Sequence, residues 1–462
     1  MTTRKSRGFD LSLLLSYIVL VGVGLLMIYS TTFNDFQGDM WSLSSPFGGQ
    51  AVWAVTSLGT VLLLSTISWQ FWDTISGLLF GLGILLLVLV LILGTEINGA
   101  TSWFIFGPFS LQPGEFAKVS TAIAVSSLLS SVQIDLKEFK SQAYVLGVML
   151  LPAVLILLQP DAGSALTYFS LIIVYYRFGL SVIYYLGLIS LFFVIVITLT
   201  SGFYFGLSAI LLIAVLLTSQ FTRKNYRYGL AFITVLLVNT LLYRYSLMHY
   251  AAIFNLVFFI IHLAFIYRSK VYNEKFIVLA SVIALSFFSF ASSYGFNNIL
   301  QPHQQDRINV WLNPEKSDPR GSYYNLAHSK LAIGSGGLYG KGYLNGSMTK
   351  LNYVPMQNTD FVFSSIGEEL GFIGSGSIIL IFLYFILRII KIGEQSKVNY
   401  IRAFCYGVGG FFFVHFFVNV GMTMGISPVI GIPLPFISKG GSSLLAFSMM
   451  VGIVLNMSKQ ER

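Results

Sequence analysis

The chain has 462 residues, of which 55% are hydrophobic and only 10% are charged. A soluble domain carries roughly 25% charged residues, so this composition excludes an ordinary soluble protein and indicates an integral membrane protein. The single cysteine, Cys405, excludes an intrachain disulfide and a CxxC redox centre. In a membrane protein, an excess of Lys and Arg such as this net charge of +9 mainly indicates which loops face the cytoplasm. We expect no nucleic-acid partner.

The predicted elements are helices from one end of the chain to the other. A basic opening, MTTRKSRG, precedes an apolar run long enough to span a bilayer; no A-x-A-like cleavage site follows it, so we interpret it as a retained first span. Barrel strands would instead show short alternating segments. The predicted fold is an all-α polytopic membrane protein with about 14 transmembrane helices, near 11–30, 50–67, 72–93, 115–131, 143–158, 162–178, 181–200, 203–219, 228–243, 247–267, 276–294, 361–388, 402–424 and 441–457.

The basic residues predict the orientation of these spans. With the N-terminus in the cytoplasm, the inner segments hold 18 of the 27 Lys and Arg residues, as the positive-inside rule requires. Both termini are then cytoplasmic, and two long segments, 94–114 and 295–360, lie outside. Within the second, SYYNLAHSKLAI is predicted to form a short helix at the membrane surface.

One glycine-rich stretch, GSGGLYGKG at 334–342, is similar to the sequence of a phosphate-binding loop. The chain has Ser335 and Gly342 where the Walker pattern needs Gly and then Ser or Thr, so we interpret the stretch as a flexible turn. With five scattered histidines and no metal-ligand motif, a His-based or metal site is not predicted.

Ionisable residues near membrane depth are the stronger indication of a site, because burying them is costly. Glu115 and Lys118 open the fourth predicted span at a spacing that lets them pair on one helix face. Other candidates share the outer side of the membrane: Asp161, Asp360, Glu368, Glu369 and Lys439. For each, local pairing or helix capping is the alternative interpretation. Trp103 is equally well explained as an interfacial residue, and Asp318, before a proline, as a turn residue.

Five stretches, in this order, resemble the SEDS family of bacterial cell-wall polymerases, which includes RodA and FtsW. They are GATSWFIFGPFSLQPGEFAK, LLQPDAGSAL, QQDRINVWLNPEKSDPRGSYYNLAHSKLAIGSGGLYGKG, LNYVPMQNTDFVFSSIGEELGFIG and GIPLPFISKGGSS. The resemblance implies a peptidoglycan glycosyltransferase of the bacterial cytoplasmic membrane that polymerises lipid II at the outer face. It also implies a class B penicillin-binding transpeptidase as partner, and it singles out Asp318 as the catalytic residue.

The chain departs from the family pattern at several positions. Gly114, Met356 and Asn358 stand where Ser, Glu and His are common, and Thr101 and Ser102 replace basic residues. The family usually has ten spans, so we expect inserted helices at 181–275. The predicted division is therefore 1–180 for the N-terminal part of the core, 181–275 for the insertion, and 276–462 for the C-terminal part with the outer catalytic loop 295–360.

The chemistry expected of such an enzyme needs one general base. Lipid pyrophosphate is a good leaving group, so Asp318 would deprotonate the acceptor hydroxyl in a single inverting displacement, a step typically worth about 10²–10⁴-fold. Positive charge for the pyrophosphate would come from Lys118, Lys439, Arg307 and Arg320. A divalent cation, Mg²⁺ or Mn²⁺, could share that task. Trp103 would shape the sugar site, and the remaining substrate-binding candidates are Glu115, Asp161, Asp360 and Glu369.

Three alternatives stay open at this stage. A lipid II flippase would place its ionisable groups near the bilayer midplane, and a scaffold would only recruit the transpeptidase. An FtsW-like role in division is the third. The segment LNGSMTKLNYVP resembles the RodA branch better and favours a role in cell elongation and shape.

Overall fold

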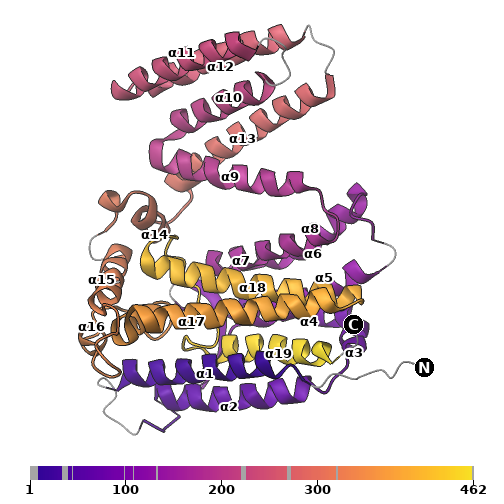
Figure 1. Cartoon of the computed structure of the whole chain (residues 1–462), viewed down its shortest axis with the longest axis vertical. Helices are drawn as coiled ribbons and strands as arrows, with labels where there is room; N and C mark the ends of the chain where they lie inside the picture. Colours follow the sequence, from indigo (N-terminus) through magenta and orange to yellow (C-terminus); the bar gives the residue numbers. More distant parts are fainter. Residues whose placement is uncertain are drawn as a thin grey trace. The chain divides into compact units, whose positions relative to one another are not determined.

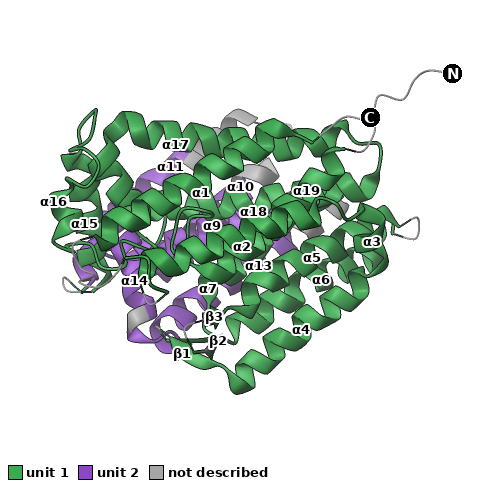
Figure 2. Ribbon diagram, turned by 90° about the horizontal axis from the view of Figure 1, so that it is seen from below, with its two compact units in different colours: residues 1–181, 318–462 green, residues 182–317 purple. Residues whose placement is uncertain are grey.

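The computed structural model describes residues 9–33, 40–43, 45–97, 99–107, 109–131, 134–219, 225–267, 272–318 and 321–459. The chain forms two compact units, Met1–Ser181 with Asp318–Arg462 and Val182–Ser317, coloured green and purple in Figure 2.

The first unit contains both ends of the chain; its helices are labelled in Figure 1 and its strands in Figure 2. They are α1 (Leu11–Thr32), α2 (Pro46–Leu64), α3 (Trp69–Thr74), α4 (Ser76–Leu93), β1 (Thr95–Ile97), β2 (Ala100–Phe106), β3 (Phe109–Leu111), α5 (Pro113–Ser130), α6 (Phe139–Leu157), α7 (Ala162–Thr167), η1 (Tyr168–Ser170), α8 (Leu171–Arg177), α15 (Ser322–Ser335), α16 (Ser347–Lys350), α17 (Val362–Gln395), α18 (Asn399–Met424) and α19 (Gly441–Ser458).

The second unit consists of helices joined by short turns in its described residues. It contains α9 (Val182–Ser201), α10 (Phe203–Ser219), α11 (Asn225–Arg244), α12 (Met248–Tyr267), α13 (Tyr272–Asn298), α14 (Pro302–Leu312) and η2 (Pro314–Lys316). An apolar cluster on α9, α10, α12 and α13 forms its core. Two polar pairs join helices of this unit. The side-chain amides of Asn239 on α11 and Asn255 on α12 exchange hydrogen bonds of 3.0 and 2.9 Å, and the buried hydroxyls of Thr198 on α9 and Ser289 on α13 lie 2.8 Å apart.

The predicted fold class is confirmed. Each of the fourteen predicted spans coincides with helix, and α15 confirms the helix predicted in SYYNLAHSKLAI. Among the described residues, nine helices are long and apolar enough to cross a membrane, and shorter apolar helices accompany them. The protein is therefore a multi-pass helical membrane protein.

The segment 94–114, predicted to lie outside, contains a small sheet that was not predicted from the sequence. Strand β2 pairs antiparallel with β1 on one side and with β3 on the other. Trp103 lies on β2 opposite Thr95, whose hydroxyl donates 3.0 Å to the Trp103 carbonyl. The chain from β3 enters α5 directly at Pro113, a residue whose fixed φ suits a first helical turn.

The core of the first unit lies where α1, α2, α5, α17, α18 and α19 pack together. Aromatic rings from α17, α18, α19 and the α18–α19 loop contact one another, with Phe412 touching Phe385, Phe436 and Phe447. Helix α1 is bonded to α17 near both of its ends. Asp10 accepts 2.8 and 2.7 Å bonds from Arg388, and the Ser30 hydroxyl donates to Glu369.

Candidate active site

The predicted pair on α5 forms. Lys118 Nζ lies 2.8 Å from Glu115 Oε1, and both side chains are buried, with 0% and 2% of their surface exposed. The i, i+3 spacing places them on one face, which confirms that part of the sequence analysis. The second carboxylate oxygen, Glu115 Oε2, is buried without a hydrogen-bond partner among the described residues. An unmet buried acceptor is costly, so this oxygen marks a position where a further donor would be stabilised.

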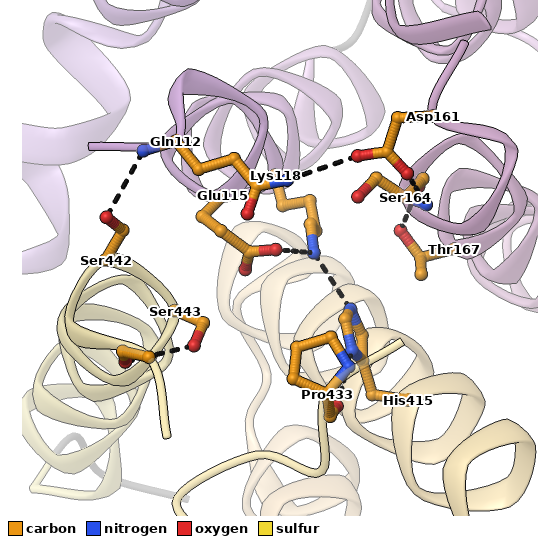
Figure 3. A network of polar contacts seen from close by, with 11 residues as sticks. Gln112, Glu115, Lys118, Asp161, Ser164, Thr167, His415, Pro433, Ser442 and Ser443 are labelled. Atoms are coloured by element: carbon orange, nitrogen blue, oxygen red, sulfur yellow. Dashed lines mark hydrogen bonds and ion pairs between the residues drawn. The ribbon is translucent and has the colours of Figure 1, made fainter. Parts of the chain in front are cut away.

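The third member of this network, His415 on α18, was not predicted from the sequence. Its Nε2 lies 2.8 Å from Lys118 Nζ, and its Nδ1 lies 3.2 Å from the Pro433 carbonyl oxygen. A carbonyl only accepts and an ammonium only donates, so Nδ1 carries the proton and Nε2 accepts from Lys118. Figure 3 shows Lys118 reaching from α5 to a point between Glu115 and His415. We call Glu115, Lys118 and His415 the Lys118 network.

Lys118 has three partners in this arrangement. Besides Glu115 and His415, its ammonium lies 5.4 Å from the centre of the Phe447 ring, within cation–π range. The His415 ring meets the same Phe447 ring edge-on at 4.8 Å. The charge of Lys118 therefore acts inside the protein, and any ligand phosphate must compete with Glu115 for it.

Asp161 lies beside this network and also caps a helix. Its Oδ1 accepts 2.9 Å from the Ser164 amide at the start of α7, and its Oδ2 accepts 3.1 Å from Gln112 Nε2. The backbone amide of Gln112 in turn donates 3.2 Å to Ser442 Oγ (Figure 3). That hydroxyl donates 2.8 Å to the Ser110 carbonyl. These bonds tie the strand end before α5 to α7 and to the start of α19.

The stretch between α18 and α19 folds back over the residues before α17. Asn419 Nδ2 donates to the carbonyls of Asp360 and Ile432 at 2.8 and 2.7 Å. The Lys439 amide donates 2.8 Å to the Asn358 carbonyl, while its side chain is exposed. Asp360 is half-buried at the start of α17. Lys439 is thus an accessible cation held on a fixed backbone.

Glu368 and Glu369 lie inside the first turns of α17 and are both buried. Glu368 forms a 2.7 Å ion pair with Lys341, and Glu369 accepts from Ser30 and, at 3.4 Å, from the Leu344 amide. The contacts of both carboxylates run to the chain between α15 and α17 and to α1. A role for Glu369 in substrate binding stays a prediction.

Asp318 has an exposed side chain directly after η2, ahead of α15. Trp103 is half-buried on β2, and Arg307 is half-buried on α14 in the 182–317 unit. Arg320 lies outside the described residues. Glu115, Lys118 and Asp161 are brought together through α5 and Gln112, whereas Glu368 and Glu369 belong to a separate set of contacts. Within the described ranges, no group of three or more His, Cys, Asp or Glu side chains is arranged to hold a metal ion.

These features define a class: a multi-pass helical membrane protein with buried ionic groups at helix starts and an acidic residue in a long connecting segment. The family model FTSW_RODA_SPOVE, described as "Cell cycle protein", matches residues 11–206 and 204–462. The chain belongs to this family.

The relatives agree with that assignment. Peptidoglycan glycosyltransferase RodA of Treponema pallidum is 32% identical over 467 residues and covers 100% of both chains. A probable peptidoglycan glycosyltransferase FtsW of Coxiella burnetii is 29% identical and covers 98% of this chain and 97% of its own. A solved structure described as "Structural coordination of polymerization and crosslinking by a peptidoglycan synthase complex" covers 97% of both chains, with 23% identity and a TM-score of 0.60. This last likeness establishes the fold.

Proposed function

We propose that the chain polymerises lipid II into glycan strands at the outer face of the bacterial cytoplasmic membrane, in cell elongation and shape. Family membership and a full-length relative named peptidoglycan glycosyltransferase RodA make the chain a peptidoglycan glycosyltransferase. The single observation that carries the proposal is this full-length relationship at 32% identity, which is closer than that to the FtsW relative at 29%.

Asp318 is the proposed general base. Its side chain is exposed, in contrast to the buried Glu115, Glu368 and Glu369. As the acceptor hydroxyl attacks the anomeric carbon, Asp318 takes its proton and the C–O bond to the lipid pyrophosphate breaks. The pyrophosphate leaves with the bonding pair, so no acid is needed to protonate an alkoxide, as glycosidases require.

Positive charge for the leaving pyrophosphate comes first from Lys439 in this proposal. Its side chain is exposed and its backbone is fixed by the bond to Asn358, and preorganised charge stabilises a developing anion. Lys118 acts from inside its network, where Glu115 already offsets its charge. Trp103 shapes the sugar site from β2, Arg307 and Arg320 are further cations, and Asp161, Asp360 and Glu369 are further contacts. A Mg²⁺ or Mn²⁺ ion bound to the substrate is compatible with this scheme.

The test is polymerisation of labelled lipid II by the purified full chain, alone and with a class B penicillin-binding transpeptidase. Asp318→Asn is expected to abolish glycan strands, and Glu315→Gln, an exposed acid on η2, is the matched control that stays active. Both variants must elute as single species and retain the partner. Full activity of Asp318→Asn would overturn the assignment of the base. If the wild type made no glycan strands under any condition, the proposed polymerase activity would be wrong.

The second candidate, a lipid II flippase, is favoured by the buried ionic Lys118 network, since transporters keep such groups between helices. A scaffold that only recruits the transpeptidase makes neither product. Proteoliposomes loaded with fluorescent lipid II separate the three: a flippase moves lipid II between leaflets without polymer, and a polymerase makes polymer. Cells depleted of the protein would lose rod shape in an elongation role and form filaments in an FtsW-like division role.

The proposed setting follows from the charge distribution. Both termini are placed in the cytoplasm, so the segments 94–114 and 295–360 face outward to lipid II and to the transpeptidase. Tagged termini that react with an impermeant probe in intact spheroplasts would contradict this orientation. Inserted helices at 181–275 stay a prediction, with a peripheral or partner-facing role.

A further inference from the structure

Helix α17 is interrupted in its first third. Gly371 has φ 65° and ψ −165° inside an otherwise helical run. In a continuous helix, the amides of Phe372 and Ile373 would bond to the carbonyls of Glu368 and Glu369, four residues earlier. A break at Gly371 separates these groups, so two donors and two acceptors need other partners.

The glycine-rich segment after α15 supplies those partners one for one. Phe372 and Ile373 donate to the carbonyls of Gly337 and Leu338 at 2.9 and 3.1 Å, and the amides of Lys341 and Gly342 donate to the carbonyls of Glu368 and Glu369 at 3.0 Å each. Residues 337–342 therefore replace the missing part of the hydrogen-bond ladder of α17. We call them the inserted segment.

Only glycine permits so close an approach of two backbones. A Cβ at Gly340, where φ is +81°, would lie 2.1 Å from the Glu369 carbonyl oxygen, and one at Gly371 would lie 2.2 Å from the Gly340 amide. A Cβ at Gly336 would lie 2.0 Å from the Gly367 carbonyl oxygen. Such distances are impossible for a side chain without movement. The stretch interpreted from sequence as a flexible turn is therefore a fitted contact surface.

The Glu368 side chain holds the chain that follows the inserted segment. Besides its ion pair with Lys341, this carboxylate accepts from the Met348 and Thr349 amides at 2.8 and 2.9 Å and from the Thr349 hydroxyl at 2.8 Å. Tyr343, between them, donates 2.9 Å to the Leu26 carbonyl of α1. Burial, with the charge of Glu369 next, raises the pKa of the Tyr343 hydroxyl to about 12, so this donor keeps its proton.

The inserted segment also fixes the end of α15, the helix that precedes it. Helix α15 ends at Ser335, one residue before Gly336, and it packs against α17 and α18. Ser329 in its middle donates 2.9 Å to the Thr423 carbonyl. Asp318 lies four residues before the first residue of α15. Anchoring α15 at its end and its middle thus restricts where Asp318 can be.

We propose that the break in α17 is a positioning device: it accepts the inserted segment as part of its own ladder, and Gly371 and Glu368 thereby set the position of α15 and Asp318. The assignment of Asp318 as the base rests on the proposed function. The hydrogen bonds between the inserted segment and α17 do not depend on it. Gly371 and Glu368 are positioning residues, which do not touch substrate.

The structural half of the test is hydrogen–deuterium exchange on the purified full chain in nanodiscs. Gly371→Ala and Glu368→Gln are expected to raise exchange in peptides covering 334–349. Gly376→Ala is the matched control, because it lies on the same helix with open space around its Cβ position; it leaves exchange in 334–349 unchanged. Unchanged exchange in both positioning variants would overturn the inference.

The functional half is the kinetics of lipid II polymerisation by monodisperse protein. A displaced base lowers kcat, by roughly 10- to 100-fold for a shift of about 1 Å, while KM for lipid II stays near the wild-type value. Thr349→Val, which removes one hydroxyl donor to Glu368, is a milder variant for use where Gly371→Ala fails to fold. Thr349→Ser restores that donor and is expected to restore kcat.

Two results separate this inference from the proposed function. Raised exchange in 334–349 with wild-type kcat would overturn the positioning role and leave Asp318 as base. Asp318→Asn is expected to lose activity with unchanged exchange in 334–349; an active Asp318→Asn would overturn the proposed base and with it the positioning of Asp318.

Discussion

Glu115 and Glu368 are both buried carboxylates at the beginning of a helix, each paired with a lysine, yet their surroundings differ. Glu368 accepts hydrogen bonds at both oxygens, from an ammonium, two amides and two hydroxyls. Glu115 uses Oε1 for Lys118, and its Oε2 has no partner among the described residues. A carboxylate whose two oxygens both accept hydrogen bonds stabilises the fold. A carboxylate with one unpaired oxygen can still accept a hydrogen bond from a further donor.

The largest effect is expected from Lys118→Met, which breaks the pair at Glu115. The carboxylate would remain buried without a counter-charge, a loss of about 3–5 kcal/mol in the free energy of unfolding. Adding Glu115→Leu removes the stranded charge and is expected to recover much of the loss. Denaturant unfolding in detergent measures both variants. A Lys118→Met protein as stable as the wild type would mean that Glu115 takes up a proton or finds another donor.

A smaller effect is expected from Glu368→Gln. The amide group keeps the shape of the side chain but removes the charge and turns one acceptor into a donor that faces other donors. Hydrogen bonds to a charged group are worth about 1.5–3 kcal/mol, and we expect a loss of that order in the same unfolding experiment. A loss as large as that of Lys118→Met would contradict the distinction between the two sites.

His415 gives a way to test the Lys118 network without changing its charge. His415→Phe removes the acceptor for Lys118 and the donor to Pro433, which should cost about 1–3 kcal/mol for the groups left unpaired. His415→Gln can still accept and donate, so it is expected to keep most of the stability. An equal loss of stability in both variants would show that His415 stabilises the protein through ring packing on Phe447 and not through its hydrogen bonds.

The smallest effect is expected from protonation of Asp10, which precedes α1 and accepts hydrogen bonds at both of its carboxylate oxygens. Burial raises its pKa, but hydrogen bonds from Arg388, Ser12 and the Leu13 amide lower the pKa by more, so it lies below the usual 3.8. The stabilisation is therefore complete above about pH 4 and is lost as the pH falls through the folded-state pKa. Unfolding measured against pH should show this loss, and Asp10→Asn should remove it.

Local patterns were sufficient for much of the molecule. Apolar runs predicted the helices, and a three-residue spacing predicted the Glu115–Lys118 pair. The sheet in 95–111 was not predicted because ATSWFIF shows no clean alternation, so its pairing depends on β1 and β3. The sequence offered β-branched and aromatic residues there as a signal, which the length of the loop obscured.

Contacts between distant residues account for the rest. His415 joins Lys118 from 297 positions away, and nothing in its neighbourhood on α18 points to a lysine. The glycine-rich stretch was compared with a phosphate-loop pattern, which asks only about nearby residues. Its actual partner is a break in another helix, and the one local signal was Gly371 following two buried acids in EELGF.

The double connection between α1 and α17 has a consequence for how the protein is made. Ser30 and Asp10 find their partners Glu369 and Arg388 at separations of 339 and 378 residues. Helix α1 is made long before α17, so Asp10 keeps only its local hydrogen bonds from Ser12 and the Leu13 amide, and Ser30 lacks Glu369, until α17 enters the membrane. The two connections that join α1 to α17 therefore form only after most of the chain has been synthesised.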